Sequence, residues 1–114
     1  MVGHRRERRR KVLEDVKRIL ASDFSIKTDS LTEHTRIVED LKLDGDDGIE
    51  FVDSFHNEYP FESSGFNYAD YFGSEGLSLG ILDWIRGRKA LRRRPLTIGM
   101  LIDAAVNGKW TPPS

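Results

Sequence analysis

The densest group of chemically active side chains is an acidic run that contains Asp44, Asp46, Asp47, Glu50 and Asp53. Closely spaced carboxylates suit the binding of Ca²⁺ or proton transfer in acid–base catalysis. A calcium loop that started at Asp44 would place glycine and isoleucine where aspartate and glycine belong, and one that started four residues earlier would end on a phenylalanine. Catalysis requires burial or a nearby charge that shifts a carboxyl pKa, and the surrounding sequence indicates no such burial. We interpret the run as the start of a helix with a solvated acidic face.

Histidine and cysteine chemistry is less favoured still. The three histidines, at positions 4, 34 and 56, lack the spacing of metal ligands, and His56 is predicted to be a partly buried packing residue near Phe55. Because the chain has no cysteine, it cannot form a disulfide, a thiolate zinc site or a thiol nucleophile. We therefore predict a protein that is not an enzyme and has no metal site and no cofactor.

Two basic runs offer another chemistry, the binding of phosphate groups. Residues 5–11 contain six bases and residues 86–94 contain six more. Over the whole chain, however, 18 Lys and Arg balance 19 Asp and Glu, and a net charge of -1 argues against a surface that binds nucleic acid throughout. The first run is more simply the solvated start of a helix. Its bases oppose the helix dipole, so we expect compensating acids nearby.

Helices must position these charges, since apolar residues recur at three- and four-residue spacing along much of the chain. At 114 residues the chain has the size of one domain, residues 1–114, with a single modest core. The fold class is predicted to be all-α. The predicted elements, in chain order, are a helix over 5–21, a packed loop over 22–45, a helix from Asp46 to Pro60, a short helix after Asn67, a helix over 79–92 and a helix over 97–107.

The second of these helices carries the acidic run. Asp46 and Asp47 are predicted as its cap and first-turn carboxylates. Asp46, Glu50 and Asp53 are spaced i, i+4 and i+7, which places them on one outward face. The predicted inner stripe consists of Ile49, Val52, Phe55 and Tyr59. The predicted core combines Val16, Leu20, Ile49, Val52, Phe55, Leu101 and Ile102.

Three stretches of this sequence resemble acyl carrier proteins. Residues 38–51 read VEDLKLDGDDGIEF, which is similar to the carrier motif in which Asp-Leu leads to Asp-Ser-Leu and then to an acidic helix. Residues 16–30 resemble the end of the carrier's first helix and its following loop, and residues 96–106 resemble its last helix. A small, uncharacterised bacterial group of carrier-like proteins is closer still. That resemblance is carried by Asp44-Gly45-Asp46-Asp47, by Tyr71-Phe72 followed by Glu75, and by residues 96–101 with Gly108-Lys109-Trp110.

The resemblance implies an acyl carrier protein-like helical bundle with an extended, insertion-like connection over residues 62–95. It also places Gly45 where a carrier has its phosphopantetheine-bearing serine. The pantetheine phosphodiester needs a side-chain oxygen, so attachment at Gly45 is excluded. In carriers the equivalent acidic helix recognises partners. The resemblance thus implies a non-catalytic protein-interaction or regulatory module, whose basic partner binds Asp46, Asp47, Glu50 and Asp53.

Two alternatives stay open on the sequence alone. One is nucleic-acid or anionic-surface binding through the basic runs, specifically Arg5, Arg6, Arg8, Arg9, Arg10 and Arg92 to Arg94. The weaker one is a carrier modified at another hydroxyl, for which Ser54 is a poor candidate because it is predicted to lie in mid-helix. No apolar run reaches the length of a signal peptide or of a membrane span, and with the absence of cysteine this predicts a cytoplasmic protein.

Overall fold

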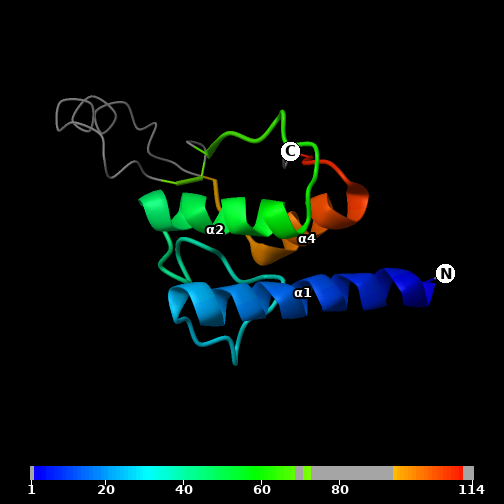
Figure 1. Ribbon diagram of the computed structural model, residues 1–114, viewed down its shortest axis with the longest axis horizontal. Helices are drawn as coiled ribbons and strands as arrows, with labels where there is room; N and C mark the ends of the chain where they lie inside the picture. Colours follow the sequence, from blue (N-terminus) through cyan, green and yellow to red (C-terminus); the bar gives the residue numbers. More distant parts are fainter. Residues whose placement is uncertain (1, 69–70, 73–93, 112–114) are drawn as a thin grey trace.

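Three helices organise the computed structural model, which describes residues 2–68, 71–72 and 94–111. They are α1 (Val2–Phe24), α2 (Gly45–Glu58) and α4 (Ile98–Asn107), and α1 contacts both of the others. Figure 1 shows α1 along the lower edge of the fold, and both α2 and α4 lie above it. The described residues form no strand, only two isolated β-bridges, so this part of the chain is all-α as predicted. None of its helices is long and apolar enough to cross a membrane.

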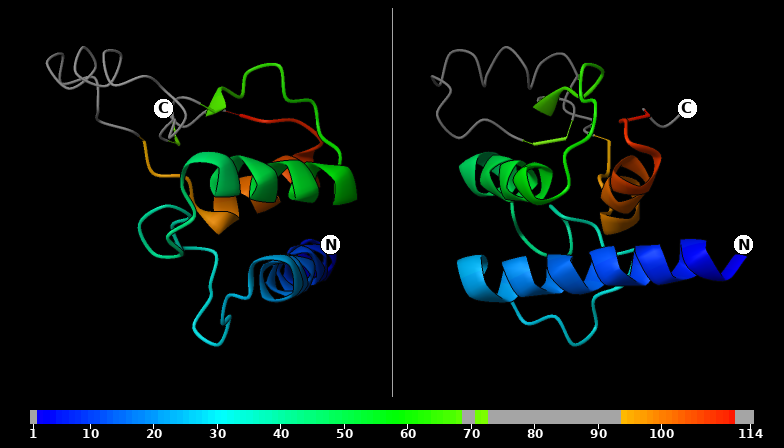
Figure 2. Two further views of the ribbon diagram at one scale, coloured as in Figure 1. Left: turned by 60° about the vertical axis from the view of Figure 1, so that its left-hand side comes forward. Right: turned by 45° about the vertical axis from the view of Figure 1, so that its right-hand side comes forward.

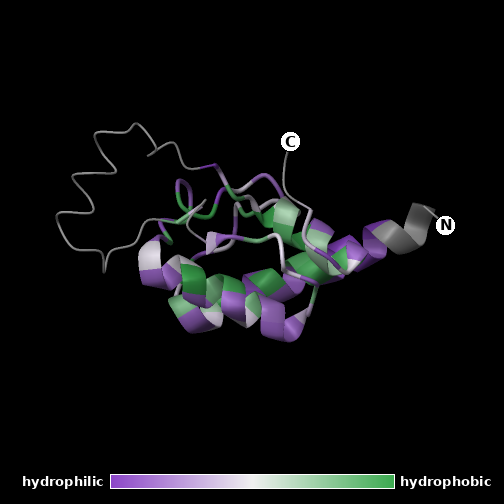
Figure 3. Cartoon of the chain, turned by 90° about the horizontal axis from the view of Figure 1, so that it is seen from above, coloured by the Kyte–Doolittle hydropathy of each residue, from purple (hydrophilic) through white to green (hydrophobic). Residues whose placement is uncertain are grey.

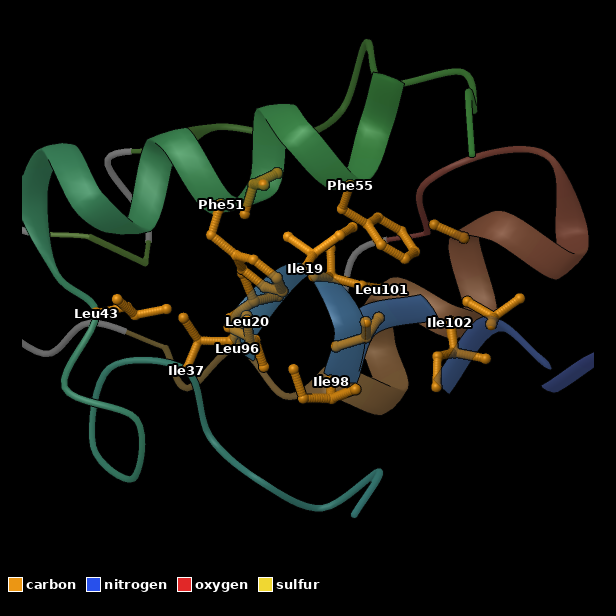
Figure 4. Close-up of a cluster of buried hydrophobic side chains, with 14 of the residues drawn as sticks. Ile19, Leu20, Ile37, Leu43, Phe51, Phe55, Leu96, Ile98, Leu101 and Ile102 are labelled. Atoms are coloured by element: carbon orange, nitrogen blue, oxygen red, sulfur yellow. The ribbon is translucent and has the colours of Figure 1, made fainter. Parts of the chain in front are cut away.

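The core lies between the three helices (Figure 4), and among the described residues it is built from hydrophobic side chains with no buried charged residue. Phe51 and Phe55 project from α2 toward α1, and Phe55 is fully buried. Every predicted core residue is buried except Ile49, which is only partly buried. The helices contribute Val12, Val16, Ile19 and Leu20 from α1, Phe51, Val52 and Phe55 from α2, and Ile98, Leu101, Ile102 and Ala104 from α4.

Helix α1 extends a few residues beyond its predicted range at both ends. It ends where Ser25 adopts a left-handed φ of 56° and the Ile26 N–H donates to the Leu20 carbonyl at 3.1 Å. This bond satisfies a carbonyl that the helix end would otherwise leave unpaired. Phe24, in the last turn, packs edge-on against Phe51 with ring centroids 6.1 Å apart, which joins α1 to α2.

The predicted packed loop between α1 and α2 is confirmed. It consists of turns, and backbone hydrogen bonds fasten it to the start of α4: Ile37 N–H to Leu96 O at 2.9 Å, Ile98 N–H to Thr35 O at 2.9 Å and Gly99 N–H to Glu33 O at 2.8 Å. At Gly99 the two segments are so close that an added Cβ would lie 2.9 Å from the Glu33 carbonyl oxygen. The second residue of α4, Gly99, is therefore required to be small.

The start of α2 differs from the prediction, in which Asp46 was the cap. Asp44 is the N-cap, and its carboxylate accepts the Gly45 N–H at 2.7 Å. Asp46 and Asp47 instead occupy the first turn, where their charge still stabilises the positive end of the helix. The first residue of the helix, Gly45, takes a φ of 59°, which glycine adopts without the penalty that a side chain imposes.

The inner stripe of α2 was also partly wrong. Val52 and Phe55 are buried as predicted, whereas Ile49 and Tyr59 are only partly buried at the edge of the core. The other buried residues of the helix are Gly45, Gly48 and Phe51. A glycine carries no hydrophobic weight in a sequence pattern, so the stripe was centred on the neighbouring isoleucine. The buried face includes Gly48, whose lack of a side chain lets another segment approach the helix.

Helix α4 matches its prediction. The Thr97 hydroxyl accepts the Met100 N–H at 3.2 Å, and Gly108 ends the helix with a φ of 83°. The chain after it is fastened to the segment after α2, since Glu62 N–H donates to Gly108 O at 2.9 Å and Trp110 N–H donates to Glu62 O at 2.7 Å. The helix predicted over 79–92 lies outside the described residues, as do most of the short helix expected after Asn67 and much of the connection over 62–95.

Candidate functional site

Four carboxylates form the exposed side of α2, and we call them the acidic face: Asp46, Asp47, Glu50 and Asp53. All four residues are exposed: Asp46, Glu50 and Asp53 lie on the outward face, as predicted, and Asp47 belongs to the first turn of the helix. Within residues 2–68, 71–72 and 94–111, none of the four forms an ion pair. The acidic face therefore presents charge that the described part of the chain leaves uncompensated.

Side chains at the C-terminal end of α2, by contrast, form polar contacts with α1. Glu58 in the last turn lies 3.2 Å from Arg18. The hydroxyl of Tyr59, just after the helix, donates a hydrogen bond to Asp15. Burial and this carboxylate raise the pKa of Tyr59 to about 12. These contacts hold the C-terminal end of α2 against α1 and leave the acidic face on the opposite, solvent side.

A hollow of about 270 Å³ opens beside the C-terminal half of the acidic face, and we call it the α2 hollow. The chain turns after α2 and runs back above the helix, as Figures 1 and 2 show. We call residues 60–68 and 71–72 the return segment, and it supplies one side of the hollow. Its lining consists of Val52, Asp53 and His56 from α2, and of Phe61, Ser63, Phe66 and Tyr68 from the return segment.

Asp53 belongs to both the acidic face and the α2 hollow. Its carboxylate Oδ1 accepts a hydrogen bond from the Tyr68 hydroxyl. Burial, and then this bond, raises the pKa of Tyr68 to about 12, so the tyrosine stays a neutral donor at physiological pH. Helical spacing correctly placed Asp53 on the outward face but did not predict this contact, which joins residues fifteen positions apart.

His56 is a packing residue, as predicted, although its neighbour is Phe61. The imidazole meets the Phe61 ring edge-on, with centroids 4.7 Å apart, and its Nε2 lies 2.8 Å from the Phe61 carbonyl oxygen. A carbonyl only accepts hydrogen bonds, so Nε2 carries the proton. The described residues include no group of three His, Asp or Glu side chains that could hold a metal ion.

Gly45, where the resemblance to carriers implies the missing serine, is part of the helix start. Gly45 is buried, follows the capping Asp44 and has a left-handed φ of 59°. A serine at this position would have to adopt a backbone conformation that L-residues rarely take. Ser54, the other candidate hydroxyl, is half-buried and lies inside α2, well beyond the helix start.

The basic start of α1 is divided between structural and free arginines. Arg9 donates to Glu33 through Nη2 at 2.5 Å and Nε at 3.2 Å, and its Nη1 lies 2.6 Å from Asp103. Chiefly through the Glu33 bond, these acids raise the pKa of Arg9. The expected compensating acids are thus present, and Arg9 is paired within the fold.

Three other arginines of that run, Arg6, Arg8 and Arg10, are exposed, and Figure 3 shows this part of α1 as largely hydrophilic. Arg94 is exposed as well. Arg92 and Arg93 lie outside the described residues, and so does the side chain of Arg5.

Comparison with known proteins gives one match. The model of the family described as "Protein of unknown function (DUF1493)" matches residues 7–111. Neither the search of curated proteins nor the search of solved structures found a match. The match spans α2, α4 and most of α1, together with the acidic face and the α2 hollow.

Proposed function

The chain belongs to the DUF1493 family, whose function is unknown, and we propose that it is a non-catalytic interaction module that binds a basic protein surface through the acidic face of α2. One observation carries the proposal. Asp46, Asp47 and Glu50 are exposed along one rigid helix, and no base within the described residues pairs with them. Uncompensated charge of one sign on a fixed element attracts the opposite charge and orients the encounter.

The scaffold supports this role, because the acidic face cannot turn inward. Phe51 and Phe55 fix the opposite side of α2 in the core, and the Arg18–Glu58 ion pair holds its C-terminal end to α1. A partner would therefore meet a preorganised surface and lose little free energy in ordering it. The resemblance to acyl carrier proteins adds to this support, since their equivalent helix recognises partners and Gly45 leaves this chain without their attachment serine.

Capture of partners by charge variants tests the proposal. The full chain is immobilised, and proteins retained from a lysate of its native host are identified by mass spectrometry. We expect a discrete partner with a basic surface that is lost when Asp46, Asp47 and Glu50 are all changed to lysine. The matched control carries the same charge change at Asp23, Asp29 and Glu39, which are exposed acids elsewhere on the chain. Circular dichroism verifies that both variants keep their helices.

Two results contradict the proposal. If both triple variants lose the partner equally, only net charge matters and the acidic face has no special role. If the partner is retained by the acidic-face variant but lost when Arg6, Arg8 and Arg10 are changed to alanine, the exposed arginines bind the ligand. Nucleic-acid binding would then be shown by a log affinity that falls with log salt at a slope of about -0.9 per duplex phosphate contact.

A further inference from the structure

We propose that the α2 hollow is an anchor site for a single arginine side chain, whose guanidinium pairs with Asp53 between the aromatic residues of the return segment. The inference rests on the proposed function, because it assigns the arginine to the basic partner. It goes further by naming the one side chain that enters the surface and the residues that would hold it.

Asp53 gives the hollow a negative charge, and its carboxylate is held in one orientation. Its Oδ1 already accepts the Tyr68 hydroxyl, which fixes the rotation of the carboxylate and leaves Oδ2 to accept hydrogen bonds. The donor is neutral, so the negative charge is undiminished. A carboxylate held in one orientation suits the planar fork of a guanidinium better than the compact ammonium of lysine.

The aromatic lining provides the second element of recognition. Phe66 and Tyr68 both line the hollow, and their rings meet at an interplanar angle of 89° with centroids 5.0 Å apart. Phe66 is held in turn by stacking on Tyr71 at 5.3 Å and by an edge contact with Trp110 at 4.8 Å. A cation placed over the face of an aromatic ring is attracted by the negative charge of that face. A rigid wall also avoids the cost of ordering it on binding.

Size selects a side chain over a larger ligand. The hollow measures about 270 Å³, below the range of roughly 300–1,000 Å³ that is typical of sites for whole small molecules and cofactors. Its apolar residues, among them Val52 and Phe61, match the aliphatic stem of an arginine, and Asp53 matches its charged end.

The position of the hollow fits a basic partner surface. Asp53 lies seven residues after Asp46, which corresponds to roughly 10 Å along the helix. An arginine in the hollow would therefore leave Glu50 and Asp46 free to meet further bases on the same partner. The hollow would fix the register of the complex, and the rest of the acidic face would add attraction at longer range.

The test uses defined peptides with the full-length chain. The probe is the acetylated, amidated peptide Gly-Lys-Gly-Arg-Gly-Lys-Gly, and the matched control replaces its arginine with citrulline, which has the same shape and no charge. Binding is followed by amide chemical shifts in the ¹⁵N-labelled protein. We expect the arginine peptide to shift signals of residues 52–68 and to bind at least tenfold more tightly than the citrulline peptide. Asp53→Asn should remove that difference, whereas Asp46→Asn should change the affinity less than threefold.

Three outcomes would overturn the anchor site: equal affinity for the two peptides, unchanged arginine binding by Asp53→Asn, or shifts confined to residues 45–50. The last result would leave the acidic face as a binding surface without a pocket. A failure of the proposed function gives a different result. In that case the chain still captures its partner after Asp46, Asp47 and Glu50 are changed to lysine, and none of these three residues lines the hollow.

Discussion

The ring of Phe72 lies directly against the backbone of Gly48. A Cβ added to Gly48 would stand 2.5 Å from Phe72 Cδ1 and 3.0 Å from the Leu43 carbonyl oxygen. Phe72 is buried, so this contact fastens the end of the return segment to the first turns of α2. The same part of the chain thus bears the acidic face on one side and receives an aromatic ring on the other.

Gly48→Ala should therefore destabilise the protein although alanine favours helices. Neither the Leu43 carbonyl nor the buried ring can move away freely, and overpacking of this kind costs roughly 1–3 kcal/mol. Chemical denaturation measures the free energy of unfolding. Asn57→Ala, at an exposed position of the same helix, is the matched control and should stay within about 0.5 kcal/mol of the parent. Equal stability of the two variants would contradict the close contact.

Local sequence signals predicted the helices well where the determinants of structure were themselves local. Thr97 and Gly108 were identified as the ends of α4, because a capping hydroxyl and a left-handed glycine act on neighbouring residues. The inner face of α2 was misplaced because the ring that fills the space over Gly48 comes from Phe72, far along the chain.

The candidate site shows the same division. Helical spacing placed Asp46, Glu50 and Asp53 on one exposed face, which the structure confirms. The α2 hollow could not be predicted, because it exists only once the return segment folds back and brings Tyr68 to Asp53. A weak signal was present in the aromatic residues that follow Pro60, although their spacing alone does not indicate which helix they cover.

Arg9 joins three parts of the fold, and its removal should cost more than that of its neighbours. Its side chain is 26% exposed and bonds to Glu33 in the loop and to Asp103 in α4. Solvent partly screens the ion pairs of Arg9 with these two carboxylates. We therefore expect Arg9→Ala to lower the free energy of unfolding by about 1–2 kcal/mol. Arg8→Ala, which removes an exposed arginine of the same run, should lose less than about 0.5 kcal/mol. Equal losses would show that only the net charge of the run matters.

Stability should fall in strong alkali through two tyrosines. Their hydrogen bonds to carboxylates and their burial raise the pKa of Tyr59 and Tyr68 to about 12, from an ordinary value of 10.0. Because the folded pKa exceeds the unfolded one, their contribution is complete below about pH 10 and is lost as the pH rises through about 12. Denaturation curves at several pH values test this. The variant with Tyr59→Phe and Tyr68→Phe should lose less stability over that window than the parent, and a parallel decline would refute the assignment.

The left-handed Gly45 predicts how the chain responds to the enzyme that loads carriers. Incubated with coenzyme A and a broad-specificity phosphopantetheinyl transferase, the parent should keep its intact mass, because Gly45 has no hydroxyl and Ser54 lies half-buried within α2. An ordinary acyl carrier protein in the same tube serves as the positive control. Gly45→Ser should be destabilised by roughly 1–2 kcal/mol, since a side chain is disfavoured at a φ of 59°. A gain of one phosphopantetheine by the parent, mapped by peptide mass spectrometry to Ser54, would replace the interaction module with a carrier that uses a displaced serine.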